Sequence, residues 1–279
     1  MKEKLEELEF VELCNDTTFK YLYKNPKIRP WFDNIIKNKF GLDLSNYQLI
    51  DNELNTGNKK KDYRLDINLK FNDNHTIIEM NNDYYTFIFN KSYQYLYRTA
   101  GNLYKEGEEY KDKHVKLILF NNFKNNKLPD LKTANFKLRE KSSNIEREEI
   151  ESYEIYLPNF KEICYHNVNS IDISLSLFSC KSYEEMREKT NNPEDIEVIK
   201  ELERLGMSSD FVFDYHHEND EKLTRISYRD DGIAEGKVQG RKEEKIEIAK
   251  NMLQKQIDIK TISECTNLSI EEIDKLKEI

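Results

Sequence analysis

KDYRLDINLKFNDNHTIIEMNN, residues 61–82, is the stretch that decides the fold. Over residues 63–71, Leu65, Ile67, Leu69 and Phe71 alternate with polar residues, and this period of two predicts a strand with one dry face and one polar face. FNDNH (71–75) is typical of a turn, and TIIEMN (76–81) predicts a second strand. Because the turn is short, the two strand centres should lie side by side as a hairpin.

Two carboxylates occupy this hairpin, Asp66 on the polar face of the first strand and Glu79 on the second. Carboxylates on adjacent strands can share one divalent cation, and their hard oxygen atoms favour Mg²⁺ or Mn²⁺. The carbonyl of Met80 could add a ligand, and Asn81 should point to the same face as Glu79. Such a cation would acidify and orient a bound water and neutralise charge on a phosphate.

The flanking segments predict an α/β order of elements. Residues 1–40 favour two helices, the second ending at Gly41, and a first strand should follow over 47–53. After the hairpin, a long helix is predicted from an N-cap at Asp83 to Gly107, and the apolar run 115–120 predicts a buried central strand.

The signal weakens after residue 121, where residues 154–158 could form a further strand. Helices are predicted near 159–166, 182–190 and 194–205. In the C-terminal part Gly232, Gly236 and Gly240 recur every four residues and would line one smooth helical stripe. Two short helices should follow, over 258–265 and 270–278, and the second opens with the capping-box pattern of Ser269 and Glu272.

Bulk properties limit the function classes. A net charge of -9 counts against a protein that coats DNA broadly, although a local basic groove would be compatible with it. The 4 cysteines are scattered without a C-x-x-C pair, which favours a reducing, cytoplasmic compartment. The N-terminus is charged, unlike a signal peptide, and no apolar run approaches the roughly 18–20 residues of a membrane span.

Four motifs stand in order along the chain: DTTFKYLY (16–23), KDYRLDI (61–67), IIEMNNDYY (77–85) and GEEYK (107–111). Together they resemble the Rpn family, which is also described as PD-(D/E)XK nuclease family transposases or recombination-promoting nucleases. The glycine-spaced tail (232–254) and the ending (263–278) are similar to the C-terminus of the same family.

This resemblance implies a restriction-endonuclease-like PD-(D/E)XK core, with αβββαβ order and a mixed sheet flanked by helices, followed by a helical C-terminal extension. It implies metal-dependent DNA cleavage with little sequence preference, linked to recombination or a mobile element. It also implies that Asp66 and Glu79 are the metal ligands.

The resemblance gives Asn81 the catalytic position at which the motif has Lys and the family often has Gln. Asn carries no charge, but it can still orient a water or a phosphate by hydrogen bonding. Lys61, Arg64 and Lys91 are the candidates for the missing positive charge and for DNA or phosphate contacts.

Three features leave two interpretations open. Glu53 could be an additional ligand or a surface residue. Asp16 could cap the first helix or face the site. The basic run 58–64 could contact phosphates or form a solvated turn.

Residues 1–160 are predicted to form the nuclease core, 161–229 a helical connector, and 230–279 an oligomerisation or regulatory segment. A homodimer or higher oligomer would let two sites cut two strands. The C-terminal helix pair could instead read DNA as a helix-turn-helix, but its second helix is acidic, whereas DNA readers usually are not. The alternative function is a catalytically weak or inactive nuclease-fold module that binds DNA or protein.

Overall fold

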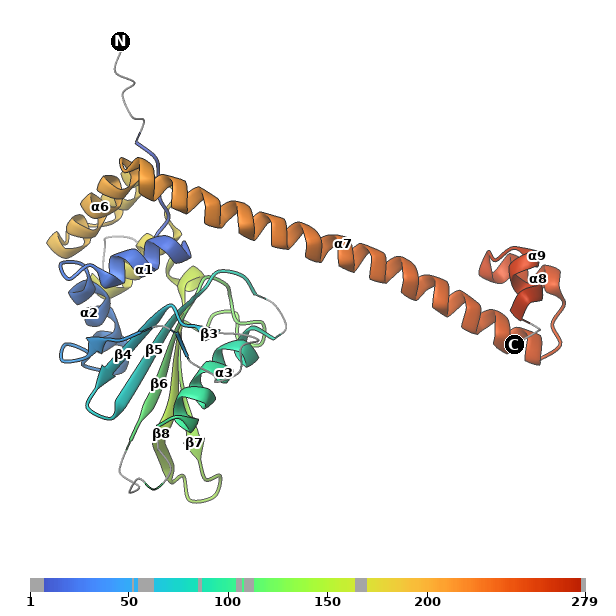
Figure 1. Cartoon of the computed structure of the whole chain (residues 1–279), viewed down its shortest axis with the longest axis horizontal. Helices are drawn as coiled ribbons and strands as arrows, with labels where there is room; N and C mark the ends of the chain where they lie inside the picture. Colours follow the sequence, from blue (N-terminus) through green and yellow to red (C-terminus); the bar gives the residue numbers. More distant parts are fainter. Residues whose placement is uncertain are drawn as a thin grey trace, which may run out of the picture. The chain divides into compact units, whose positions relative to one another are not determined.

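The computed structural model of the chain (Figure 1) describes residues 8–51, 53–54, 63–84, 87–103, 107, 113–163 and 170–276. Side chains are described at these positions except at 53–54, 63–64 and part of 218–229. The strands are β1 (Gln48–Leu49), β2 (Glu53–Leu54), β3 (Tyr63–Arg64), β4 (Ile67–Phe71), β5 (Asn74–Asn81), β6 (Val115–Asn121), β7 (Thr133–Arg139) and β8 (Glu146–Tyr156). The helices are α1 (Asp16–Lys24), α2 (Arg29–Phe40), α3 (Ile88–Gly101), η1 (Leu157–Phe160), α4 (Ser170–Ser176), η2 (Leu177–Ser179), α5 (Tyr183–Lys189), α6 (Pro193–Gly206), α7 (Ser209–Gln254), α8 (Ile259–Thr266) and α9 (Ile270–Lys275).

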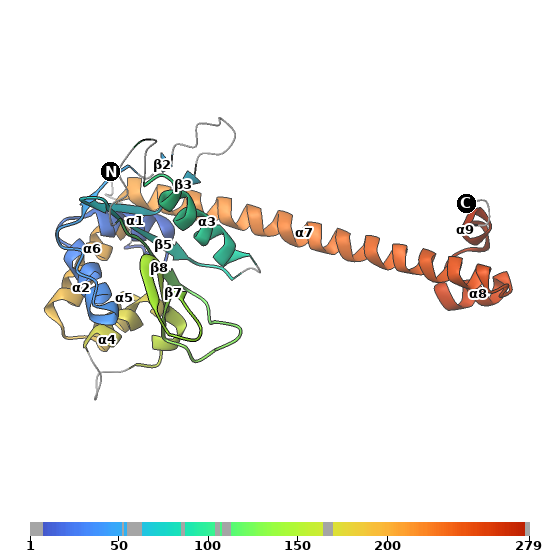
Figure 2. The same cartoon turned by 90° about the horizontal axis from the view of Figure 1, so that it is seen from below.

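A six-stranded mixed sheet with the order β1-β4-β5-β6-β8-β7 forms the centre of the described N-terminal part. The central strands β5, β6 and β8 run parallel, and the outer strands pair antiparallel. Strand β6 is buried on both faces, as its apolar run predicts: Ile118 and Phe120 pack toward α1 and α2, while Leu117 and Leu119 pack toward α3. Figures 1 and 2 show the sheet between these helices. The mixed α/β class is therefore confirmed.

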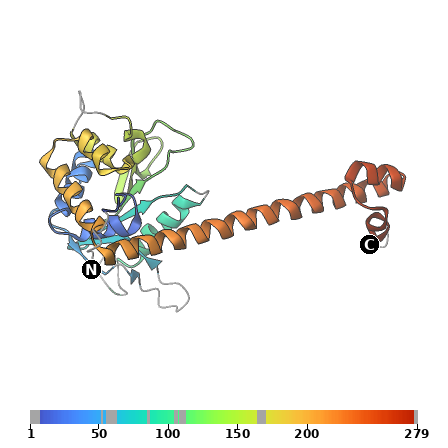
Figure 3. The ribbon, with the colours of Figure 1, turned by 90° about the horizontal axis from the view of Figure 1, so that it is seen from above.

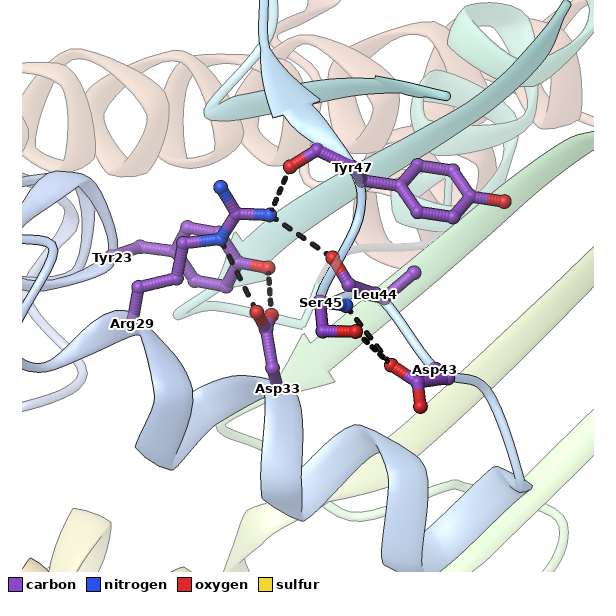
Figure 4. Close-up of polar contacts among 7 residues, drawn as sticks. All are labelled: Tyr23, Arg29, Asp33, Asp43, Leu44, Ser45 and Tyr47. Atoms are coloured by element: carbon purple, nitrogen blue, oxygen red, sulfur yellow. Dashed lines mark hydrogen bonds and ion pairs between the residues drawn. The ribbon is translucent and has the colours of Figure 1, made fainter. Parts of the chain in front are cut away.

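A polar clasp holds α1, α2 and the loop before β1 together (Figure 4). The Arg29 guanidinium donates to Asp33 at 3.2 Å and to the carbonyl oxygens of Leu44 and Tyr47 at 3.2 and 2.6 Å. Tyr23 of α1 donates to the other oxygen of Asp33 at 2.6 Å. Because hydrogen bonds to charged groups are among the stronger ones, the clasp fixes α1 against its neighbours.

The predicted strand over 63–71 is interrupted. Strand β3 pairs with β2, and β4 begins only at Ile67, where it pairs with β5. Between them, the Asp66 carboxylate accepts the backbone N–H of Met80 at 3.0 Å. A side chain thus takes the place of a backbone partner in the ladder, which ends the regular pairing.

The helix after the hairpin is shorter than predicted. Asp83 is not its N-cap: α3 begins at Ile88, with Phe87 at the N-cap and no side-chain capping bond. It ends at Gly101, with Asn102 at its C-cap, well before Gly107.

The hairpin of β7 and β8 was missed from sequence, apart from the end of β8 near residues 154–156. The first residues of β8 are exposed and charged, so they carry no alternating signal. The helix predicted over 159–166 is wrong where it can be checked: only the 3₁₀ turn η1 reaches Phe160, and 161–163 are not helical, while 164–166 lie outside the described residues.

The chain divides into two compact units, Met1–Tyr215 and His216–Ile279. Residues of α4, α5 and α6 belong to the same hydrophobic core as α1 and α2. The division into segments 1–160, 161–229 and 230–279 stays a prediction. Helix α7 runs without interruption across the glycine-spaced stretch (Figure 3).

In the second unit, the end of α7, α8 and α9 share a small core centred on Ala249, Ile262, Leu268 and Ile273. The capping box of Ser269 is confirmed, because its side chain accepts the N–H of Glu272 and the Glu272 side chain accepts in return. None of the helices in the described part of the chain combines the length and apolarity needed to cross a bilayer.

Candidate metal centre

Asp66 and Glu79 lie directly opposite each other at the edge of the sheet where β4 begins. The register pairs Ile67 with Ile78 in antiparallel strands, so Asp66, which precedes Ile67, lies opposite Glu79, which follows Ile78. The Glu79 Oε1 atom accepts the backbone N–H of Asp66 at 3.0 Å, and Asp66 Oδ2 accepts the N–H of Met80 at 3.0 Å. Each carboxylate is thus held against the other residue's strand.

The backbone N–H and C=O groups of Met80 both face Asp66. In an antiparallel ladder the N–H and C=O of a residue face the same neighbouring strand. Because the N–H of Met80 donates to Asp66, its carbonyl oxygen faces that side as well. Two carboxylates thus lie on neighbouring segments of chain beside one carbonyl, and all three are hard oxygen donors of the kind that Mg²⁺ or Mn²⁺ prefers.

The Glu79 side chain is almost completely buried, with 2% of its surface exposed. Burial raises its pKa well above the usual value, and the negative charge of Asp66 raises it further. The positive charges of Lys91 and Lys20 act in the opposite direction. Two adjacent carboxylates in a dry place are costly unless positive charge lies nearby, and Lys20 and Lys91 supply such charge.

Lysines reach the pair from both sides of the sheet. Lys20 of α1 lies with its Nζ 2.8 Å from Asp66 Oδ1. Lys91 of α3 lies over the ring of Tyr95, with its Nζ 5.7 Å from the ring centroid. Of the sequence candidates for positive charge, Lys61 and the side chain of Arg64 lie outside the described residues, and Lys91 is near the pair.

Asn81 points along the carboxyl ends of the strands. Its Nδ2 donates to Asn121 Oδ1 of β6 at 2.9 Å, and only 4% of Asn81 is exposed. One N–H of the Asn81 amide is therefore used in a hydrogen bond to the neighbouring strand.

The structure decides between the two interpretations of Asp16 but not between those of Glu53. Asn15, and not Asp16, caps α1, because the Asn15 side chain accepts the N–H of Thr18 at 3.0 Å. Asp16 Oδ1 instead accepts from Asn82 Nδ2 at 2.7 Å, which ties the start of α1 to the end of β5. The side chain of Glu53 is outside the described residues.

A third carboxylate lies too far away to join the pair. Glu154 is in register with Glu79 but two strands over, since Leu119 of β6 lies between them. Strands are about 4.8 Å apart, so the two backbones are separated by roughly twice that distance. Glu154 instead accepts from the hydroxyls of Tyr156 and Tyr93. Within the described residues, no group of three His, Cys, Asp or Glu side chains is arranged to hold a metal ion.

Sequence reasoning missed Lys20. A signal was present: Asp16 and Lys20 are four residues apart and share one helix face, and both lie within the motif DTTFKYLY. One contacts the end of β5 and the other contacts Asp66.

The C-terminal segment matches a known family. Residues 242–278, which span the end of α7 with α8 and α9, match the family model described as "Rpn/YhgA-like nuclease family, C-terminal HTH domain". This match agrees with the resemblance drawn from the sequence motifs, and a helix-turn-helix domain suggests DNA binding. The description favours the DNA-reading alternative for this segment over a purely oligomeric role. No curated protein and no solved structure matches the chain.

Proposed function

We propose that the chain is a metal-dependent DNA endonuclease, with Asp66 and Glu79 as the ligands of Mg²⁺ or Mn²⁺. The observation that carries the proposal is the pair of opposed carboxylates, with the Glu79 oxygen held 3.0 Å from the backbone nitrogen of Asp66. The match of the C-terminal segment to a nuclease family supports it independently.

Each residue of the site would have its own role in the proposed reaction. Asp66, Glu79 and the Met80 carbonyl would hold the cation, which when bound supplies Lewis acidity and a more acidic water. Asn81 would orient that water through its amide oxygen, because a neutral amide can accept but cannot take on charge. Lys91 would offset negative charge on the phosphate.

The C-terminal segment would deliver DNA to this site. Cleavage with little sequence preference, and a link to recombination or a mobile element, belong to the same proposal. They rest on the family resemblance of the motifs.

The test is cleavage of supercoiled plasmid by the full-length protein with Mg²⁺ or Mn²⁺. We expect nicked or linear products that disappear with a chelator and in both Asp66→Ala and Glu79→Ala. Plasmid that stays intact with either metal, or cleavage that survives both substitutions, would overturn the proposal. Thermal unfolding of each variant separates loss of the site from loss of the fold.

A second candidate is a nuclease-fold module that binds DNA without cutting it. The bond that ties Asn81 to Asn121 favours it, since the motif's Lys is missing and its replacement is directed sideways. Gel-shift binding with retained affinity in Asp66→Ala, together with intact plasmid for the unaltered protein, would select this candidate.

The homo-oligomer is tested most cleanly at the glycine stripe. A Cβ added at Gly236 meets no atom within 4 Å in the single chain, so Gly236→Leu should leave the isolated helix intact. If the stripe packs against a second copy, the substitution should lower the mass measured by light scattering. Lys237→Leu, on the next helical position, is the matched control and should keep the mass. An unchanged mass in both variants would contradict an interface at the stripe.

A further inference from the structure

We infer that Lys20 of α1 supplies the positive charge at this site that the motif normally places at the position of Asn81. The inference rests on the proposed function and adds to it a residue from another element of the fold.

The ion pair is short and directed. Lys20 Nζ lies 2.8 Å from Asp66 Oδ1, while the other oxygen of the same carboxylate accepts the N–H of Met80. Charge-assisted bonds of this length are stronger than neutral ones. The ammonium therefore lies beside the oxygen donors that would hold a cation.

Helix α1 holds the lysine in place. Phe19, Leu22 and Tyr23 of α1 are fully buried on one side. Asp16 bonds to Asn82 at one end, and the clasp of Tyr23 with Asp33 secures the other (Figure 4). A charge on a packed helix is preorganised, so little reorganisation is needed when negative charge develops.

Lys20 is also accessible to a substrate, unlike Asn81. Its side chain is 34% exposed and lines a cavity of about 420 Å³, together with the basic Lys24 and Arg204 and the acidic Asp210 and Asp214. Lys20 therefore contacts Asp66 while part of its side chain is open to this cavity. Asn81 is only 4% exposed, is bonded to β6 and carries no charge.

Lys24 makes the matched control. It follows Lys20 by one helical turn and lines the same cavity, so both substitutions remove one positive charge from one helix face. The two lysines differ in that Lys20 forms the ion pair with Asp66.

The experiment compares Lys20→Met, Lys20→Arg, Lys24→Met and Lys91→Met in the full-length protein. Three quantities are measured: the single-turnover cleavage rate at saturating Mn²⁺, the Mn²⁺ dissociation constant by calorimetry without DNA, and the unfolding temperature. For Lys20→Met we expect the rate to fall by about 10²- to 10³-fold. Lys20→Arg should recover part of that loss, and Lys24→Met should stay within about threefold of the unaltered rate.

The Mn²⁺ affinity separates a charge role from a packing role. Removing a positive charge beside the ligands should tighten Mn²⁺ binding by roughly threefold to tenfold, since like charges repel. A residue that merely held the ligands in place would, when removed, weaken Mn²⁺ binding. Lys20→Met should thus bind the metal more tightly while cutting more slowly.

The outcomes are distinct. If Lys20→Met cuts as fast as Lys24→Met, or binds Mn²⁺ more weakly, the inference is overturned while the proposed function stands. A loss that appears in Lys91→Met but not in Lys20→Met assigns the charge to α3 alone and also overturns the inference. If the unaltered protein never cuts, the proposed function fails, and the calorimetric comparison alone then decides whether Lys20 opposes a cation at this site. Should Lys20→Met fold poorly, Lys20→Gln carries the same measurements.

Discussion

Replacing Glu79 with Gln should lower the metal-dependent cleavage rate by about 10³-fold, while the metal-free protein keeps or gains stability. Gln retains an oxygen that can accept the Asp66 N–H, which Glu79 accepts at 3.0 Å. It loses the negative charge that a divalent cation requires. The rate is measured on plasmid DNA with Mn²⁺, and stability by thermal unfolding in a chelator.

In the metal-free protein, Glu79 should make the free energy of unfolding depend on pH. Burial and the charge of Asp66 raise the folded-state pKa of Glu79 above its ordinary value of 4.5. The folded protein therefore binds this proton more tightly than the unfolded chain. Stability from Glu79 is fully present below about pH 4.5 and is lost as the pH rises through the raised pKa.

Glu79→Gln should remove that loss. In chelator, the unfolding temperature of the unaltered protein should fall more steeply with rising pH than that of the variant. The buried Glu154, whose pKa burial also raises, contributes equally to both proteins and cancels in the comparison. Any fixed penalty from the new amide also cancels, because only the slope is compared. Parallel slopes would show that Glu79 is not held in the environment described.

Gly206→Ala should be the most damaging single methyl addition among the described glycines. A Cβ at this position would lie 2.0 Å from the backbone oxygen of Glu9, far inside van der Waals contact. The same backbone segments are joined by a bond from Glu9 N–H to the Gly206 carbonyl, at 3.2 Å. Tyr183 adds a bond from its hydroxyl to the Glu9 carbonyl at 2.9 Å. Backbone cannot rotate away as a side chain can, so the segment must shift.

We expect Gly206→Ala to lower the free energy of unfolding by about 3 kcal/mol or more, measured by urea denaturation. Gly101→Ala, at the end of α3, is the matched control, because a Cβ there meets nothing within 4 Å. That change should lie within about 1 kcal/mol of zero. Equal effects of the two substitutions would contradict the close approach at Gly206.

Local signals in the sequence were sufficient for much of the fold. The positive φ of 73° at the C-cap of α2 requires a residue such as Gly41, which the sequence supplies. The apolar run of β6 and the capping box of Ser269 were likewise readable, because each depends on neighbours within a few residues.

Features that depend on distant partners were not readable. Strand β8 begins with exposed charged residues and is a strand because β7 and β6 pair with it. Helix α3 begins only at Ile88, and the chain before Asp83 is bonded to the neighbouring strand, where the carbonyl of Asn81 accepts the N–H of Asn122. Local propensity is a weak guide where tertiary pairing decides.

The sequence by itself determined that Asp66 and Glu79 would face each other, because a period of two and a short turn leave few registers. It also determined that Asn81 carries no charge. Only the tertiary structure decided which basic side chain lies beside the carboxylates. Lys20 reaches Asp66 because the packing of α1 against the sheet carries it there, and no local pattern encodes a contact between a helix and a strand so far apart in the chain.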